Sequence, residues 1–279
     1  MREIDVSIIE KKVSELCIKA CTVAPPDIQK FMGEAISKED GLALQVIQSM
    51  LENHELSQLN AMPLCQDTGL VVVFLKIGQD VRLVGGDITE AINAGVRHGY
   101  DVGYLRKSVV ADPIRRINTK DNTPAIIHYE IVPGSQIELI VSPKGFGSEN
   151  MSRLKMLVPS DGIQTIKDFA IETVRLADSN ACPPIIVGIG IGGDFESCAI
   201  MAKKALLREL GQSHPDPFWA KVEQELLEEI NSLGIGPAGL GGYSTAMGVH
   251  INTFATHIAG LPLAVNLGCH VNRHEGCTI

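Results

Sequence analysis

Three of the seven cysteines lie in segments that suit the ligands of a metal centre. Proline or glycine interrupts regular structure around each of them, in the stretches PLCQDTG, NACPPI and NLGCHVNRH. Thiolates from Cys65, Cys182 and Cys269 can hold three irons of a [4Fe–4S] cluster and leave the fourth iron open. An open iron is a Lewis acid that binds a hydroxyl or carboxylate oxygen and weakens a carbon–oxygen bond. Because the three cysteines are far apart in the chain, their spacing alone does not establish this interpretation.

The other four cysteines are predicted not to be cluster ligands. Cys17, Cys21 and Cys198 fall at apolar positions of helical patterns, where a free cysteine packs as a small hydrophobic side chain. Cys277 lies near the C-terminus, outside the three loop motifs. An odd number of cysteines in a chain of this size also favours reduced thiols over a disulfide framework.

Two further chemistries remain open in glycine-rich and histidine-rich segments. Gly188, Gly190 and Gly193 fit the dinucleotide fingerprint G-x-G-x-x-G between a predicted strand and a predicted helix. No second parallel strand ending in an acid follows that helix, so glycines that let a strand and a helix pack closely are the favoured interpretation. A zinc site is the other alternative, although no C-x-x-C pair is present and Arg273 stands between two candidate ligands. The zinc candidates are His250, His257, Cys269, His270, His274 and Cys277.

The order of elements predicts an α/β fold with mixed sheets and surrounding helices. Pro133–Gly134 is a turn signal that predicts pairing of strands 124–132 and 136–142, and the tail from Gly234 is glycine-rich before the last predicted strand. One catalytic domain over residues 1–279 is expected, with a possible subdomain boundary near 155–160, and no internal repeat stands out. The predicted helices are 5–24, one opening at Asp27, 41–56, 88–105, 162–179, 195–210 and 217–233, and the other predicted strands are 70–77, 185–191 and 262–268.

Composition restricts the class of partner. With 279 residues, of which 45% are hydrophobic and 4% aromatic, the chain can bury a large core built from aliphatic side chains. A formal net charge of -9 argues against nucleic acid, whose binding depends on neutralising phosphates. No stretch approaches the ~20 apolar residues that cross a bilayer, and the acidic start does not read as a signal peptide. We therefore expect a soluble, cytoplasmic protein that contacts neither membrane nor nucleic acid.

Five motifs follow one another along the chain: CQDTG (65–69), KGFGSEN (144–150), ACPP (181–184) with IGG (191–193), GLGGYSTA (239–246) and CHVNRH (269–274). In this order they resemble the iron–sulfur (class I) fumarase and L-tartrate dehydratase family, in its α-subunit form. The resemblance implies that the three loop cysteines converge on one [4Fe–4S] cluster, whose open iron serves the reversible hydration of a dicarboxylate. Fumarate, hydrated to malate, is the leading substrate, and L-tartrate is the alternative.

Four more positions match the family's site residues. Asp67 matches an aspartate that contacts the substrate hydroxyl and takes part in proton transfer, with a turn cap as the alternative. Arg106 in YLRKS matches an arginine whose planar fork holds a substrate carboxylate, with a solvated helix-end charge as the alternative. Gly147 matches a backbone site that the substrate approaches closely. His257 in THIAG matches a catalytic histidine, with a core histidine as the alternative.

The resemblance also implies a partner. One-chain members continue into a second catalytic domain that brings a threonine base, further arginines and a lysine, whereas this chain stops at Ile279. A separate β subunit is therefore expected to complete the active site, in an α2β2 heterotetramer. The competing class is a non-catalytic iron–sulfur or zinc protein, such as a redox sensor. Electron-transfer clusters normally have four protein ligands, however, and Asp67 and Arg106 would then have no role.

Overall fold

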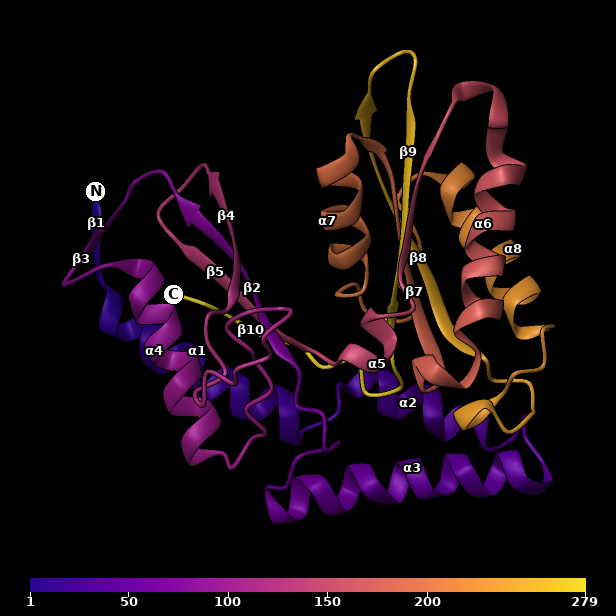
Figure 1. Ribbon diagram of the computed structural model, residues 1–279, viewed down its shortest axis with the longest axis horizontal. Coiled ribbons are helices and arrows are strands. Elements are labelled where there is room, and N and C mark those ends of the chain that lie inside the picture. Colours follow the sequence, from indigo (N-terminus) through magenta and orange to yellow (C-terminus); the bar gives the residue numbers. More distant parts are fainter. The chain divides into compact units, whose positions relative to one another are not determined.

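The computed structural model describes all 279 residues and divides the chain into two compact units (Figure 1). The first unit comprises residues 1–25, 54–146 and 273–279, and the second comprises residues 26–53 and 147–272. The chain therefore enters the second unit early, returns to the first, and closes the first with its last residues. None of the helices combines the length and the apolar composition needed to cross a lipid bilayer.

The first unit is built on a four-stranded mixed sheet of order β10-β5-β2-β4. The central strand β2 runs parallel to β4 and antiparallel to β5, while β1 and β3 form a separate parallel pair. Helices α1 and α4 pack closely, since a Cβ on Gly95 of α4 would lie 2.4 Å from the carbonyl oxygen of Glu10 in α1. The elements are β1 (Arg2–Asp5), α1 (Val6–Thr22), β2 (Leu70–Gly78), β3 (Val81–Val84), α4 (Ile88–Val102), β4 (Ile126–Val132), β5 (Ile137–Lys144) and β10 (Glu275–Thr278); α3 (Gly41–Asn60) is divided between the units.

The predicted pairing of strands 124–132 and 136–142 is wrong. The strands themselves form, as β4 and β5, but they flank β2 instead of bonding to each other. The physical reason lies in β2, whose sequence LVVVFLKIG is almost entirely buried. A strand that is apolar on both faces is most stable between two neighbours, where both of its edges are hydrogen-bonded.

The second unit contains another four-stranded mixed sheet, of order β6-β9-β7-β8. Its central strand β7 is parallel to β8 and antiparallel to β9. Helix α7 covers one face of this sheet, and α6 and α8 cover the other (Figure 1). The elements are α2 (Pro26–Ala35), α5 (Phe146–Glu149, beginning at the boundary), β6 (Arg153–Leu157), α6 (Gly162–Ala177), β7 (Ile185–Gly193), α7 (Phe195–Ala205), α8 (Pro217–Asn231), β8 (Ala246–Thr256), β9 (Leu261–Gly268), and 3-10 helices at Pro159–Asp161, Asp178–Ala181 and Pro237–Gly239.

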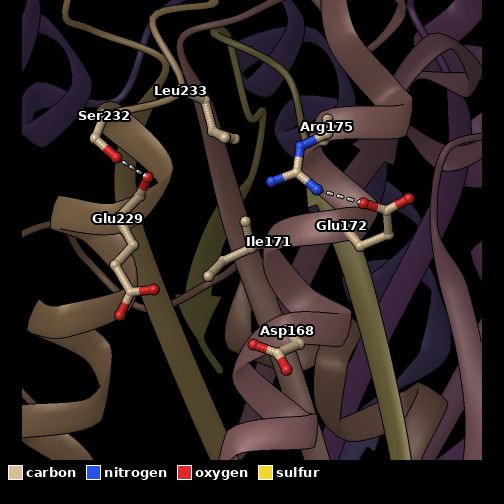
Figure 2. A pocket seen from close by; sticks show the side chains of 7 residues that line it. All are labelled: Asp168, Ile171, Glu172, Arg175, Glu229, Ser232 and Leu233. Atoms are coloured by element: carbon tan, nitrogen blue, oxygen red, sulfur yellow. Dashed lines mark hydrogen bonds and ion pairs between the residues drawn. The ribbon is translucent and has the colours of Figure 1, made fainter.

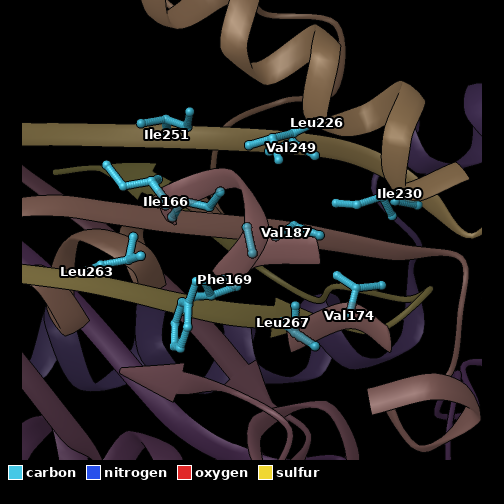
Figure 3. Packing of buried hydrophobic residues seen from close by; sticks show 14 of the residues in the cluster. Ile166, Phe169, Val174, Val187, Leu226, Ile230, Val249, Ile251, Leu263 and Leu267 are labelled. Carbon is cyan, nitrogen blue, oxygen red and sulfur yellow. The ribbon is translucent and has the colours of Figure 1, made fainter. Parts of the chain in front are cut away.

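The two faces of β7 are packed in different ways. Branched side chains such as Val187 fill the core beneath α6 and α8 (Figure 3), and Ile189 belongs to the same buried cluster. The glycines between them face α7, where a Cβ on Gly190 would lie 2.0 Å from the carbonyl oxygen of Cys198, and one on Gly188 would lie 2.2 Å from that of Ala202. Their role is close strand–helix packing, which was the favoured interpretation of the G-x-G-x-x-G pattern.

The predicted fold class, a mixed α/β protein with surrounding helices, is confirmed. No strand was predicted between Gly234 and the strand at 262–268, and the structure adds β8 at residues 246–256. Its first six residues are all buried, so they lack the polar–apolar alternation by which a half-exposed strand is recognised. Within KGFGSEN, β5 continues to Lys144 and α5 forms directly after Gly145.

Candidate active site

The first predicted ligand lies in a tight turn that leads into β2, here called the Cys65–Gly69 turn. Cys65 is half-buried, and its thiol donates to the side-chain oxygen of Gln66 at 3.5 Å. Gly69 has φ +81°, and a Cβ there would lie 2.8 Å from the backbone of Lys144 at the end of β5. Only glycine fits this left-handed position without a clash. The turn is therefore held against the end of the neighbouring strand.

Asp67 is fixed in this turn by two main-chain amides. Its Oδ1 accepts from the N–H of Gly69 at 2.9 Å, and its Oδ2 accepts from the N–H of Phe146 at 2.9 Å. The first bond is the turn cap that was the alternative to a functional role. The second joins the carboxylate to the KGFGSEN motif, so Asp67 does more than close its own turn.

Arg106 belongs to the segment that follows α4, and its main chain is joined to the same turn. Its carbonyl oxygen accepts from the side-chain hydroxyl of Thr68 at 3.1 Å. The side chain is exposed, and the guanidinium makes no hydrogen bond or ion pair within the chain. An exposed guanidinium without a partner is available to a carboxylate. The first unit thus joins the segments that carry Cys65, Asp67 and Arg106.

One buried cation, Arg273, lies near Asp67, and a second, Lys144, belongs to the strand end against which the turn is held. Arg273 is 4% exposed and donates from Nε to the carbonyl oxygen of Pro143 at 3.4 Å, and Lys144 is 7% exposed with its Nζ 3.1 Å from the carbonyl oxygen of Gly145. A Cβ on Gly145 would lie 3.1 Å from Nη2 of Arg273 and 3.3 Å from Oδ2 of Asp67. These cations favour an anion in a chain whose net charge is negative. Sequence reasoning missed Lys144, although its place in KGFGSEN was a signal.

The second unit brings the other two predicted ligands side by side. Antiparallel pairing sets Ile186, near the start of β7, opposite Gly268 at the end of β9. Cys182 precedes that start and Cys269 follows that end, and the N–H of His270 donates to the carbonyl oxygen of Cys182 at 3.1 Å. Cys182 is exposed and has a left-handed backbone with φ 55°, while Cys269 is half-buried. The sheet therefore gathers two cysteines that are distant in sequence.

Gly147 lies next to the segment that carries Cys182. A Cβ on Gly147 would lie 3.3 Å from the carbonyl oxygen of Asn180, two residues before that cysteine. The motif around Gly147 is anchored by Glu149, whose carboxylate accepts from Nζ of Lys203 at 2.6 Å and from Nδ2 of Asn266 at 2.8 Å. Sequence reasoning missed this anchor, for which the acid of KGFGSEN was the available signal.

His257 is not brought to Cys182 and Cys269 within the second unit. It lies in the exposed turn between β8 and β9, and its Nδ1 accepts from the N–H of Ala259 at 3.2 Å. Strand β7 pairs with residue 246 near Cys182 and with residue 256 at its other end, so His257 is at the opposite end of the sheet from Cys182 and Cys269. The eight steps between the nine residues of β7 span about 26 Å at roughly 3.3 Å each. The alternative of a core histidine does not hold either, and the catalytic role of His257 stays a prediction.

The four remaining cysteines have environments that oppose ionisation. Cys17, Cys21 and Cys198 are buried in helices, and Cys277 is half-buried in β10. Burial raises the pKa of all four thiols, that of Cys21 to about 11. A metal ligand must be a thiolate, so these surroundings disfavour metal binding. The packing role predicted for Cys17, Cys21 and Cys198 is confirmed.

The zinc alternative finds no support in the second unit. His250 is buried, with Nδ1 3.1 Å from the carbonyl oxygen of Ala205, and His257 and Cys269 occupy opposite ends of one sheet. Side chains so separated within one unit cannot share a four-coordinate zinc ion, whose ligand bonds are about 2.0–2.3 Å long.

A hollow of about 460 Å³ lies between α6 and α8 and contains none of the predicted site residues (Figure 2). Its cation, Arg175, is paired with Glu172 at 2.6 Å, so its charge is already compensated. The hollow does not contribute to the candidate site. Its lining residues are Asp168, Ile171, Glu172, Arg175, Glu229, Ser232 and Leu233.

Comparison with known proteins covers both units. Residues 10–278 match the family described as Fumarate hydratase (Fumerase). The chain is 43% identical over 272 residues to the putative L(+)-tartrate dehydratase subunit alpha of Methanocaldococcus jannaschii, a match that covers 95% of each chain. It is 36% identical over 215 residues to the L(+)-tartrate dehydratase subunit alpha of Escherichia coli strain K12, a match that covers 76% of this chain and 70% of the relative. The matched residues of the family include all three loop cysteines.

Proposed function

The chain belongs to the fumarate hydratase and tartrate dehydratase family of hydro-lyases, and we propose that it is the α subunit of an L(+)-tartrate dehydratase. The names of the relatives favour tartrate over fumarate, which was the leading substrate expected from the motifs. The observation that carries the proposal is the bond between the Cys65–Gly69 turn and the backbone of Arg106. That bond joins the segment that carries Cys65 and the Asp67 carboxylate to the segment that carries the exposed guanidinium of Arg106.

The donor set fits a [4Fe–4S] cluster held by three thiolates. Cys65, Cys182 and Cys269 are more accessible than Cys17, Cys21 and Cys198, and the segments of Cys182 and Cys269 are already joined by a hydrogen bond. In this proposal the three loop cysteines hold the cluster. When bound, the cluster supplies a Lewis-acidic iron for the oxygen that leaves.

The side chains of the first unit have separate tasks in this proposal. Arg106 binds one substrate carboxylate through two parallel N–H···O bonds, the geometry in which guanidinium and carboxylate match. Asp67 accepts a hydrogen bond from the substrate hydroxyl and orients it, since each of its oxygens uses only one lone pair on a main-chain amide, and it takes part in proton transfer at that oxygen. Gly147 leaves room for the substrate to approach the backbone.

A β subunit supplies the rest of the reaction. Loss of water across a carbon–carbon bond also needs a clamp for the second carboxylate and a base for the proton on carbon. We assign both to a separate chain, because the relatives are named as alpha subunits. The expected assembly is an α2β2 heterotetramer.

Hydration of fumarate to malate is the second candidate. The matching family is described as Fumarate hydratase, and malate differs from tartrate by one hydroxyl. Asp67 and Arg106 serve both substrates equally, so these two residues do not separate the candidates.

The test is turnover by the α–β complex, purified and reconstituted with iron and sulfide without oxygen. L(+)-tartrate, D(−)-tartrate, malate and fumarate are assayed in parallel, and oxaloacetate from tartrate is measured by its reduction with NADH. We expect the highest kcat/KM with L(+)-tartrate and no turnover by the α chain alone. A higher kcat/KM with malate would select the second candidate, and an inactive complex with an intact cluster would contradict both.

A further inference from the structure

The segment between α4 and β4 carries Arg106, and two buried polar side chains connect it to the Cys65–Gly69 turn. Thr68 is 1% exposed and Asn122 is not exposed at all. Most of the intervening segment is exposed and contains only an isolated bridge between Val110 and Asn118. Arg106 lies outside any helix or strand, so hydrogen bonds fix its backbone. Besides those of Thr68 and Asn122, the N–H of Leu105 donates to the carbonyl oxygen of Tyr100 at 3.0 Å, and Nδ2 of Asn118 donates to that of Lys107 at 2.9 Å.

Thr68 makes the first connection. Its hydroxyl donates to the carbonyl oxygen of Arg106 at 3.1 Å, and its own carbonyl oxygen accepts from the hydroxyl of Tyr100 at 2.6 Å. The residue directly follows Asp67 in the chain. A shift of Thr68 would therefore move the carboxylate and the arginine backbone together.

Asn122 makes the second connection, and it uses both ends of its amide. Its Nδ2 donates to the carbonyl oxygen of Gly69 at 3.2 Å, and its Oδ1 accepts from the N–H of Ser108 at 2.7 Å. Asn122 also has φ 62°, a left-handed conformation that asparagine tolerates better than most residues. The side chain thus links the main chain of Gly69 to that of Ser108.

Together the two connections fix the backbone on which the Arg106 side chain stands. A long side chain loses rotamer freedom on binding, and a fixed backbone reduces the remaining cost of ordering. A misplacement of about 1 Å at a binding group can cost as much as 10²-fold in rate. We propose that Thr68 and Asn122 are positioning residues that hold Arg106 in register with Asp67 for recognition of a substrate carboxylate. This inference rests on the proposed function.

The test compares substitutions that remove one bond at nearly constant volume. Thr68→Val removes the donor, Thr68→Ser restores it, and Asn122→Asp places an acceptor against the carbonyl oxygen of Gly69. Thr119→Val is the matched control, because its hydroxyl donates to the carbonyl oxygen of Val109 in the same segment but not to Arg106. Each α chain is reconstituted with β, and kcat, KM, iron content and hydrogen exchange of residues 104–110 are measured.

We expect KM for L(+)-tartrate to rise about tenfold in Thr68→Val, with a smaller change in kcat and unchanged iron content, since one positioning bond is lost. Asn122→Asp should behave alike, Thr68→Ser should recover the wild-type KM, and Thr119→Val should match the wild type. Hydrogen exchange at residues 104–110 should quicken only in Thr68→Val and Asn122→Asp.

A wild-type KM in Thr68→Val, or a loss of activity that parallels loss of iron and is not rescued by serine, would overturn the inference alone. Absence of turnover in the wild type would overturn the proposed function and the inference together.

Discussion

The two units use the same strand arrangement to present their cysteines. Each sheet has a central strand, β2 or β7, with a parallel neighbour, β4 or β8, on one side and an antiparallel neighbour, β5 or β9, on the other. An outer strand, β10 or β6, pairs antiparallel with that second neighbour. In both units the predicted ligands lie where the central strand begins and its antiparallel neighbour ends. The motifs in the two places share little sequence, so this correspondence is one of topology.

The strand ends that carry the predicted ligands are held by different kinds of hydrogen bond in the two units. In the first unit, side chains of Tyr100, Asn122 and Thr68 bond to the main chain around the Cys65–Gly69 turn. In the second unit, the corresponding hydrogen bonds join main-chain atoms. The N–H of Cys182 donates to the carbonyl oxygen of Ser179, that of His270 to Cys182, and that of Asn272 to Cys269. Substitutions of polar side chains should therefore disturb the first end, and substitutions that change backbone packing should disturb the second.

Asp67→Asn gives the largest expected effect, because it removes the ionisable carboxylate and replaces one of the two oxygens that accept from the amides of Gly69 and Phe146. We expect turnover by the reconstituted complex to fall by about 10²–10⁴-fold, the usual contribution of a positioned proton-transfer group. Iron content should stay at the wild-type level. Asp101→Asn is the control, since Asp101 pairs with Lys107 in an exposed position of the same unit. Unchanged turnover in Asp67→Asn would remove this residue from the chemistry.

Gly190→Ala tests the backbone packing of the second unit. Its Cβ would meet the carbonyl oxygen of Cys198 at 2.0 Å, so α7 must move away from β7. We expect the free energy of unfolding to fall by about 3 kcal/mol, the upper range for overpacking a core. Gly33→Ala in α2 is the control, because nothing lies within 4 Å of its added methyl group and alanine should stabilise that helix. Denaturant unfolding measures both variants. Equal changes in their free energies of unfolding would contradict the packing account.

His250 should make the second unit sensitive to acid. Burial, assisted by the nearby charge of Arg208, lowers the pKa of His250 to about 4, whereas an unfolded histidine titrates near 6.5. The unfolded chain therefore binds a proton between these values and the folded chain does not. Stability from this residue is complete above pH 6.5 and falls by up to about 3 kcal/mol as the pH approaches 4.

The check is the pH dependence of unfolding in His250→Gln. This variant should lose that part of the acid destabilisation, while His257→Gln, which alters an exposed histidine of the same unit, should keep it. An identical pH dependence in His250→Gln and wild type would show that the buried ring does not titrate as described.

Tyr100→Phe gives the smallest expected effect and tests the side-chain bonds of the first unit. The hydroxyl donates to the carbonyl oxygens of Thr68 and Gly69, at 2.6 and 3.2 Å, within a buried environment. We expect a loss of about 1 kcal/mol in the free energy of unfolding, typical of one net hydrogen bond. Thermal unfolding of the α chain measures it. A loss of several kcal/mol would mean that the ring, rather than its hydroxyl, is disturbed.

Sequence reasoning recovered the elements whose pattern is strong within one segment. The apolar periodicity of α1 and the aliphatic runs of β2 and β7 were recognised because burial in these elements leaves a regular imprint. β8 was missed because it is polar and exposed at one end and wholly buried at the other. The partner of β5 was wrong because pairing depends on which strand is buried on both faces, a property of the whole sheet.

The candidate site was predictable to a different degree. The three loop cysteines, Asp67 and Arg106 stood out by motif, but the contacts of Thr68, Asn122 and Lys144 depend on segments that are distant in the chain. The place of His257 likewise follows from strand direction, since β8 and β9 meet at the end of the sheet away from Cys182. No local pattern contains that information.

The most direct test of the central proposal, that Cys65, Cys182 and Cys269 are the ligands of one cluster, is iron content after anaerobic reconstitution. Wild type, Cys65→Ser from the first unit, Cys182→Ser and Cys269→Ser from the second, and Cys21→Ser as a buried control are treated alike. We predict about four irons per chain in the wild type and the control, and loss of the cluster in each of the other three variants, because a cluster with an open iron has only three protein ligands. A full complement of iron in Cys65→Ser, Cys182→Ser or Cys269→Ser would contradict the claim.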